Sequence, residues 1–342
     1  MTDLATLPRL VQRNARERPG RPAMREKDRG IWQTFTWGQY CEQVRDFALG
    51  LAALGFGRGE KLSVIGDNRP RLYWAQVAAQ ALGGVSVPVY QDSIAKELAY
   101  VWNHAEVGVI VAEDQEQVDK VLTLRDELPA LRLVVYDDPR GMLHYRHDWL
   151  KSFAEVQELG RKFGDAHPGW FEAEVEKGRL EDIAFVCYTS GTTGTPKGAI
   201  ITHANAIATA QAAVAAEDFR AEDDYLAYLP MAWIGDAFYT LILSLYVGFA
   251  CNCPESPETV QRDLRELGPT LLLAPPRIWE NMLTAVQVKG ADAPWVKRRV
   301  FEFFRGVAER VEILRSDGKP VPRGLRVLDA LGEFFVYGPI RD

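Results

Sequence analysis

The 342-residue chain has little cysteine, no excess of positive charge and no long apolar run. Its four cysteines are too few for a disulfide scaffold, and the one-residue spacing of Cys251 and Cys253 fits a zinc site poorly. The formal net charge of −7 argues against a nucleic-acid partner. The longest apolar stretch, 237–251, is shorter than the ~20 residues that a membrane span needs. Residues 1–20 lack the apolar centre of a signal peptide, so we expect a cytoplasmic protein.

The residues that are present indicate an α/β protein. With 47% hydrophobic and 25% charged residues, the chain can bury a substantial core. Short apolar segments alternate with amphipathic ones, which predicts mostly parallel sheets covered by helices. We expect strands over 61–66, 85–89, 107–112, 131–136, 183–188, 224–229, 249–253 and 270–273. We expect helices over 36–54, with Thr36 as N-cap, and over 71–82, 94–104, 116–128, 203–216, 236–248, 257–267 and 277–288.

One segment carries the strongest chemical signal. The apolar run 183–186 leads into residues rich in glycine and hydroxyl groups: Tyr188, Thr189, Ser190, Gly191, Thr192, Thr193, Gly194, Thr195, Pro196, Lys197 and Gly198. Glycines allow tight turns whose backbone N–H groups form an anion site, and Lys197 adds a positive charge. Ligands of parallel α/β folds bind beyond the carboxyl ends of strands, where this segment lies. We therefore predict a site for the phosphates of a nucleotide.

A Walker-type phosphate loop does not explain this segment. That motif requires Gly-Lys-Ser/Thr, whereas Lys197 follows Pro196 and Gly198 replaces the hydroxyl residue. Pro196 also directs Thr195 away from helical geometry, so we expect Lys197 on an extended segment. A surface loop with no ligand is the alternative, but the ordered spacing that ends in Pro-Lys-Gly favours the phosphate site.

The segment 188–198 resembles the signature loop of the adenylate-forming (AMP-binding) superfamily. Flanking motifs resemble its long-chain acyl-CoA synthetase branch. These motifs are Val87-Pro88-Val89-Tyr90, Glu97-Leu98-Ala99-Tyr100, Asn103-His104-Ala105-Glu106, the segment 111–118, Leu229-Pro230-Met231-Ala232 and the segment 275–280. The resemblance runs from near the N-terminus to the last residue.

The resemblance implies an acid–thiol ligase. A fatty acid would react with ATP to give an acyl-adenylate and pyrophosphate, and CoA would then displace AMP. Residues 189–197 would hold the β- and γ-phosphates, with Thr189 as a ligand of Mg²⁺ and Lys197 as a mobile counter-charge. Two other hypotheses stay open: an adenylating ligase for aryl or other carboxylic acids, and a nucleotide-binding fragment or pseudoenzyme without turnover.

The resemblance also implies that the chain is the N-terminal part of such an enzyme. We expect two α/β subdomains, 1–180 and 181–342, the second truncated. A C-terminal domain bearing a catalytic lysine would be absent, together with the ribose-binding acid and the hinge. We therefore expect this chain alone not to complete the reaction.

The segment 229–236 is a second candidate site. Many relatives have a histidine at the position of Trp233. The tryptophan could form an apolar wall for the acid substrate, or it could be a packed core residue. Asp236 is a better candidate for a helix N-cap than for a catalytic base. The basic and aromatic segment 297–304 could contact an anionic membrane surface, but a solvated helix face over a core stripe is the favoured explanation.

Overall fold

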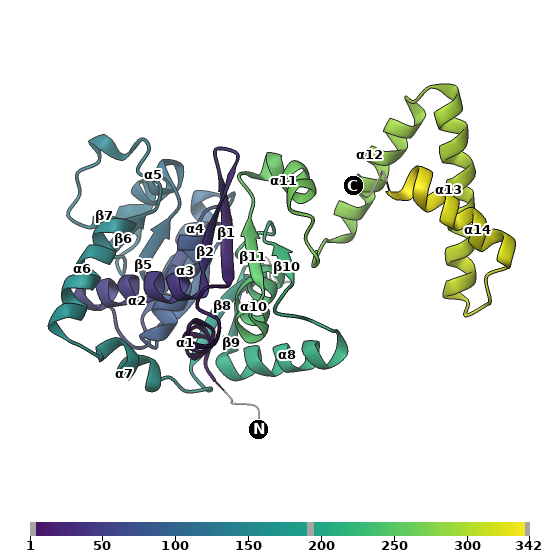
Figure 1. Cartoon of the computed structure of the whole chain (residues 1–342). Coiled ribbons are helices and arrows are strands. Elements are labelled where there is room, and N and C mark those ends of the chain that lie inside the picture. The colour runs from purple at the N-terminus through teal and green to yellow at the C-terminus, as the bar shows by residue number, and fades with distance from the viewer. Residues whose placement is uncertain (1–4, 190–194, 339–342) are drawn as a thin grey trace. The chain divides into compact units, whose positions relative to one another are not determined.

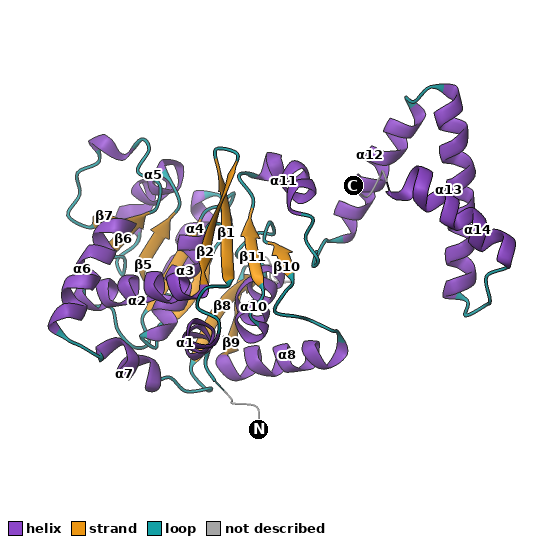
Figure 2. Ribbon diagram, in the orientation of Figure 1, coloured by secondary structure: helices purple, strands orange, loops and turns teal. Residues whose placement is uncertain are grey.

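The computed structural model describes residues 5–189 and 195–338, and these residues form two compact units, 1–272 and 273–342. The first unit is α/β, and its helices and strands are shown in Figures 1 and 2. Its strands are β1 (Pro22–Asp28), β2 (Ile31–Thr36), β3 (Lys61–Ile65), β4 (Val85–Pro88), β5 (Val107–Ala112), β6 (Leu133–Tyr136), β7 (Leu150–Ser152), β8 (Ile183–Thr189), β9 (Lys197–Thr202), β10 (Asp224–Leu226) and β11 (Ala250–Cys253).

The helices of this unit alternate with the strands along much of the chain. They are α1 (Leu7–Glu17), α2 (Trp37–Ala53), α3 (Pro70–Ala81), α4 (Ala95–His104), α5 (Gln115–Leu124), α6 (Phe153–Ala166), α7 (Trp170–Glu176), α8 (His203–Ala216), α9 (Ile234–Asp236), α10 (Ser244–Val247) and α11 (Val260–Leu267). Thr36 caps α2 as predicted, because its hydroxyl accepts a hydrogen bond from the Gln39 N–H. A π-helix, Ala237–Leu243, joins α9 to α10.

The strands form a seven-stranded sheet, in the order β7-β6-β5-β3-β4-β8-β9, and a four-stranded sheet, in the order β10-β11-β1-β2. All neighbouring pairs are parallel except β8 with β9 and β1 with β2. The predicted fold class, mostly parallel sheets covered by helices, is therefore confirmed. The division at residue 180 stays a prediction; each sheet takes strands from both sides of that residue.

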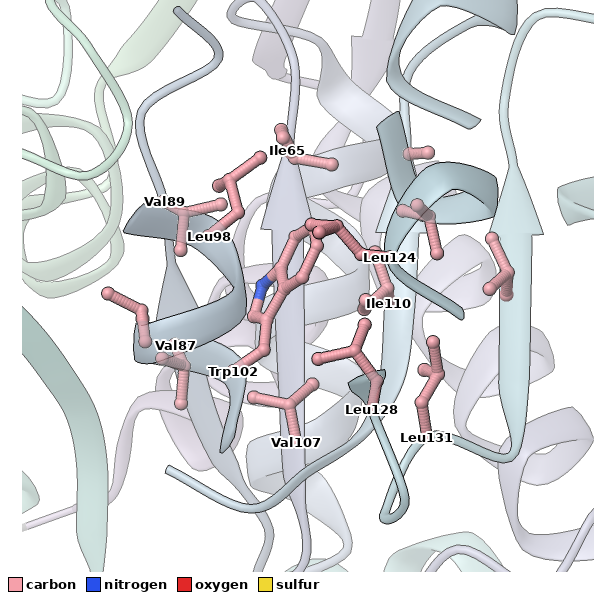
Figure 3. Close-up of a cluster of buried hydrophobic side chains, with 14 of the residues drawn as sticks. Ile65, Val87, Val89, Leu98, Trp102, Val107, Ile110, Leu124, Leu128 and Leu131 are labelled. Carbon is pink, nitrogen blue, oxygen red and sulfur yellow. The ribbon is translucent and has the colours of Figure 1, made fainter. Parts of the chain in front are cut away.

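One face of the seven-stranded sheet is covered by α4 and α5, and its buried side chains surround Trp102 (Figure 3). The indole N–H of Trp102 donates a hydrogen bond to Ser63 Oγ on β3, at 2.9 Å. This bond satisfies a polar group that burial would otherwise leave without a partner. Because each central strand has helices above and below, its residues are buried on both faces, as in all six residues of β5.

The region 137–181 shows no clear helix or strand pattern in the sequence, yet it forms regular structure. One reason is that its helix α6 packs on α2. Phe47 and Phe153 stack with their ring centroids 4.0 Å apart. A side chain at Gly160 would place its Cβ only 1.8 Å from the Asp46 carbonyl oxygen, so a glycine is required for this close approach. The sequence prediction missed β7, α6 and α7 in this region, and also α1, β1 and β2 near the N-terminus.

Two further expectations are corrected. The predicted strand over 270–273 is reduced to a single bridge between Leu271 and Tyr225. The predicted continuous helix over 236–248 is interrupted by the π-helix.

The second unit is helical and contains α12 (Pro276–Ala291), α13 (Trp295–Ser316), α14 (Arg323–Gly332) and a π-helix, Glu333–Tyr337. Helix α13 contacts both α12 and α14. The Tyr337 hydroxyl donates a hydrogen bond to the Phe304 carbonyl oxygen, at 2.6 Å, which ties the last helix to α13.

Candidate functional site

A cavity of about 220 Å³ lies where the carboxyl ends of strands from both sheets of the first unit meet. Four loops line it: those that follow β3, β4, β10 and β11. Their lining residues are Gly66, Asp67, Asn68, Val89, Tyr90, Gln91, Asp92, Tyr228, Pro230, Met231, Pro254, Ser256, Pro257 and Val260. Parallel α/β folds bind ligands at this edge of their sheets, so the cavity is a candidate substrate site.

The lining of the cavity is apolar and rich in hydrogen-bond acceptors. Carboxylates come from Asp67 and Asp92, and an amide comes from Asn68. Within the described parts of the chain, no lysine or arginine belongs to the lining. A phosphate group would therefore have no counter-charge from these side chains, and the cavity suits an uncharged part of a ligand better.

Beneath this lining, the carboxylate of Asp236 is fully buried. It accepts hydrogen bonds from the Tyr73 hydroxyl at 2.8 Å, from Thr240 Oγ1 at 3.1 Å and from Asn68 Nδ2 at 3.2 Å. Burial raises the pKa of Asp236 to about 7, although these three neutral donors oppose the change. The network holds the amide of Asn68 in place at the floor of the cavity.

The N-cap role that we expect for Asp236 is wrong. Trp233 precedes the first residue of α9, and Asp236 is the last residue of that helix. Its carboxylate bonds to side chains of α3 and of the loop after β3, and to Thr240 in the π-helix, instead of to the free N–H groups of a helix start.

The hairpin of β8 and β9 carries the two described ends of the predicted phosphate loop. Thr189 is paired with Lys197 across the hairpin, and both side chains are exposed. Lys197 is the first residue of a strand, so the extended conformation predicted from Pro196 is confirmed. The predicted ligands Ser190, Gly191, Thr192, Thr193 and Gly194 lie outside the described residues, and Thr195 is described and exposed.

Two side chains from α4 support this hairpin close to its loop end. The Tyr100 hydroxyl donates a hydrogen bond to the Pro196 carbonyl oxygen, at 3.2 Å. His104 Nδ1 lies 2.7 Å from the Tyr188 hydroxyl, and burial raises the pKa of Tyr188 to about 12. Tyr100 and His104 stack with ring centroids 5.5 Å apart. Sequence reasoning did not assign these residues a role, because their spacing on α4 says nothing about a contact with a segment over 80 residues away.

Trp233 is 37% exposed, which excludes the interpretation as a packed core residue. Its ring lies so close to Gly235 that a Cβ at that glycine would come within 2.5 Å of it. Trp233 is not among the described residues that line the cavity.

The described residues contain no group of three or more His, Cys, Asp or Glu side chains that could hold a metal ion. Cys251 and Cys253 are buried in β11, as small core residues would be. Mg²⁺ usually arrives with nucleotide phosphates and keeps several waters, so a single hydroxyl such as that of Thr189 fits its donor requirements. Of the helices in the parts described, none combines the length and the apolar character needed to cross a membrane.

Comparison with known families and proteins agrees with the fold. The sequence matches the family described as AMP-binding enzyme over residues 11–339. A long-chain-fatty-acid–CoA ligase, ACSBG2 of Xenopus laevis, is 28% identical over 345 residues, which cover 96% of this chain and 46% of the relative. The chain thus spans about half the length of the curated relatives it matches.

Solved structures show the same fold at low sequence identity. The adenylation domain of a carboxylate reductase from Mycobacterium chelonae has a TM-score of 0.70 and 20% identity, with 84% of this chain and 49% of that chain covered. An anthranilate CoA ligase in complex with anthranoyl-AMP has a TM-score of 0.67 and 21% identity, with 78% and 49% covered.

Proposed function

This chain belongs to the AMP-binding enzyme family, and from that premise we propose that it activates a fatty acid with ATP for transfer to CoA. The carboxylate attacks the α-phosphorus of ATP, pyrophosphate leaves, and the CoA thiol then displaces AMP from the acyl-adenylate. The observation that carries this proposal is the pairing of Thr189 with Lys197. This pairing brings the two described ends of the predicted phosphate loop to the carboxyl end of β8.

The first step brings an anionic acid to an anionic nucleotide, so it depends on charge neutralisation and positioning. Lys197 would supply a counter-charge to the phosphates. Thr189, Ser190, Gly191, Thr192, Thr193, Gly194 and Thr195 would supply N–H and hydroxyl donors, and Thr189 would also be a ligand of Mg²⁺. When it is bound with the nucleotide, Mg²⁺ would neutralise part of the phosphate charge. The contacts of Tyr100 and His104 support this role, because they anchor the hairpin next to Lys197, at its loop end.

The cavity between the two sheets would receive part of the acid. Its described lining combines apolar side chains with the carboxylates of Asp67 and Asp92 and has no lysine or arginine, which supports an uncharged acyl portion rather than phosphate. Trp233 is partly exposed in the loop that contributes Pro230 and Met231 to the lining, and it would offer the acid a further apolar surface. The name of the Xenopus laevis relative favours a long-chain acid, and the anthranilate ligase supports an aryl acid as the second candidate.

The loop is tested by Lys197→Ala. We expect Mg·ATP binding to weaken. In a full-length version with the C-terminal domain, we expect the rate of hydroxamate formation from acid, ATP and hydroxylamine to fall by about 100-fold, as for loss of one charge-stabilising donor. Lys162→Ala is the matched control, since that lysine is exposed on α6 and pairs with Glu158. Calorimetry measures binding, and the hydroxamate assay measures turnover.

Wild-type binding and turnover in Lys197→Ala would refute the assignment of the loop. Assays with palmitate and with benzoate distinguish the two substrate classes. Binding of Mg·ATP with no turnover on either acid would support the non-catalytic alternative.

A further inference from the structure

Two loops on opposite sides of the cavity are connected by one side chain that does not itself line it. Gly66, Asp67 and Asn68 follow β3 in the seven-stranded sheet, and Pro254 and Ser256 follow β11 in the four-stranded sheet. Arg69 begins on the first of these loops, and its guanidinium reaches the second.

The guanidinium contacts both sides with well-formed hydrogen bonds. Nη1 donates to the Pro254 carbonyl oxygen and Nη2 donates to the Glu255 carbonyl oxygen, each at 2.9 Å. Nε donates to Glu113 Oε1 at 2.8 Å. The fork of an arginine is rigid and planar, so three bonds from one guanidinium fix the direction of the side chain as well as its position.

Glu113 anchors this arginine to the sheet and to the first loop at once. Its Oε2 accepts a hydrogen bond from the Asp67 N–H, at 2.6 Å. Gly66 has a φ of +151°, and a Cβ there would lie 2.4 Å from the Glu113 Cβ, so the loop backbone packs directly on the glutamate. The side chains of Arg69 and Glu113 are 16% and 14% exposed, which protects the pair from water.

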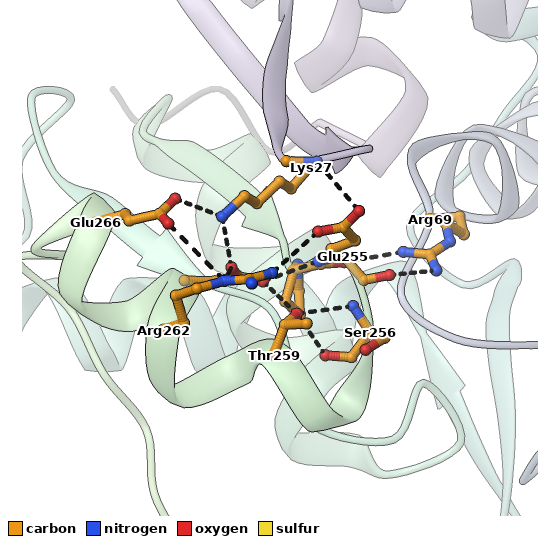
Figure 4. A network of polar contacts seen from close by, with 10 residues as sticks. Lys27, Arg69, Glu255, Ser256, Thr259, Arg262 and Glu266 are labelled. Carbon is orange, nitrogen blue, oxygen red and sulfur yellow. Dashed lines mark hydrogen bonds and ion pairs between the residues drawn. The ribbon is translucent and has the colours of Figure 1, made fainter.

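The second loop is also held from the side away from Arg69, as Figure 4 shows. Asp263 Oδ2 accepts hydrogen bonds from the Glu255 N–H at 3.0 Å and from Thr259 Oγ1 at 2.6 Å. Lys27 Nζ donates to Asp263 Oδ1 at 2.7 Å and also pairs with Glu266. Glu255 therefore has its carbonyl oxygen bound by Arg69 and its N–H bound by Asp263.

We propose that Arg69 is a positioning residue: anchored by Glu113, it holds the loops after β3 and β11 at a fixed separation and so sets the shape of the cavity for the acid substrate. This inference rests on the proposed function, because it assigns the cavity to the acid. Arg69 acts through the two loops and touches no reacting atom.

The first test measures the loops directly and does not depend on any activity. Hydrogen–deuterium exchange of residues 254–259 is compared in wild type, Arg69→Lys and Arg71→Lys. The lysine keeps the charge but loses the fork, so we expect exchange in this segment at least about 10-fold faster in Arg69→Lys. Arg71 lies two residues further along the chain, in α3, and bonds to Asp137. Arg71→Lys should therefore leave the exchange rate of residues 254–259 unchanged.

The second test asks whether the contacts of Arg69 with the two loops affect binding of the acid substrate. In the hydroxamate assay we expect Arg69→Lys to raise the KM for the acid by about 10-fold while kcat and the KM for ATP stay within about twofold. Glu113→Gln, which weakens the anchor but keeps its shape, should raise the same KM by a smaller factor. Thermal unfolding establishes that each variant is folded at the assay temperature.

Unchanged hydrogen–deuterium exchange in Arg69→Lys would refute the proposal that Arg69 holds the two loops. Faster exchange with a wild-type KM for the acid would overturn its role in substrate positioning, as would an equal rise in Arg71→Lys. Absence of acid-dependent turnover in the full-length wild type would refute the proposed function, while the exchange comparison would still decide whether Arg69 holds the loops.

Discussion

Two regions beside the cavity each bury an aspartate completely, yet the pKa of the aspartate changes in opposite directions in the two regions. At the floor, three neutral side chains donate hydrogen bonds to Asp236, and burial raises its pKa to about 7. In the wall behind the loop after β11, burial acts in the same direction on Asp263, but hydrogen bonds from Lys27 and Thr259 lower its pKa. Burial alone therefore does not fix the pKa of an aspartate, because the number and charge of its hydrogen-bond donors act against burial.

The difference has a structural meaning. The Lys27–Asp263 pair joins β1, near the N-terminus, to α11, more than 230 residues later, so its charge supports a contact between distant segments. The network around Asp236 joins groups that also define the floor of the cavity. The first region is built for a fixed charge, and the second tolerates a change of protonation near neutral pH.

The largest expected effect comes from removing the cation of the wall. Lys27→Met leaves Asp263 buried without its partner, and we expect the free energy of unfolding at pH 7 to fall by about 3–5 kcal/mol. Urea denaturation measures this change. Lys162→Met, which removes an exposed lysine paired with Glu158, should change the free energy of unfolding by less than about 1 kcal/mol. A loss of less than about 1 kcal/mol in Lys27→Met would show that the pair is not needed.

The next effect is the pH dependence of the floor. The unfolded state releases the Asp236 proton near its ordinary pKa of 3.8, whereas the folded state keeps it up to about 7. Between these values the folded state binds the extra proton, so this group's contribution to stability falls as the pH rises, by about 1.4 kcal/mol per pH unit. Asp236→Asn removes the titration. The stability of wild type relative to this variant should therefore decline from pH 5 to 6.5, measured by urea denaturation at each pH. A constant difference would contradict the raised pKa.

The smallest effects come from two threonines that each donate to a buried aspartate, although the Thr259 hydroxyl also bonds to the Ser256 backbone. Thr259 donates to the charged Asp263 and Thr240 donates to Asp236, at 2.6 and 3.1 Å. Hydrogen bonds to charged groups contribute about 1.5–3 kcal/mol, and neutral ones about 1 kcal/mol. At pH 5.5 we expect Thr259→Val to reduce the free energy of unfolding by the larger of these amounts and Thr240→Val by the smaller. Equal losses at that pH would mean that the two carboxylates carry the same charge.

Much of the fold could be predicted because its signals are local. Apolar runs such as 107–112 and the cap at Thr36 depend on neighbouring residues, and both expectations are confirmed. The hairpin of β1 and β2 could not be recognised so easily, because its strands carry charged and exposed residues. Its place in the sheet depends on pairing with β11, which no local pattern encodes.

The site could be predicted in part for the same reason. The signature segment is contiguous, so its position after β8 follows from sequence, and Pro196 correctly predicts an extended Lys197. The cavity is assembled from four loops, and its supports, Arg69 with Glu255 and Asn68 with Asp236, join residues more than 160 positions apart. Spacing along a single chain gives no information about such contacts. Asp236 shows the consequence: a helix cap was the reasonable local interpretation, and a tertiary network replaced it.

The pairing of Thr189 with Lys197 has one more consequence. Neighbouring strands lie about 5 Å apart. The paired strands β8 and β9 therefore hold Thr189 and Lys197, the two residues that flank the intervening segment, at a fixed separation. A ligand bound there would not have to bring those ends together, and the entropy of closing that stretch of chain has already been lost in folding. Selectivity among anions would then depend on their length, because an anion must extend away from the hairpin while it stays within bonding distance of the Lys197 ammonium.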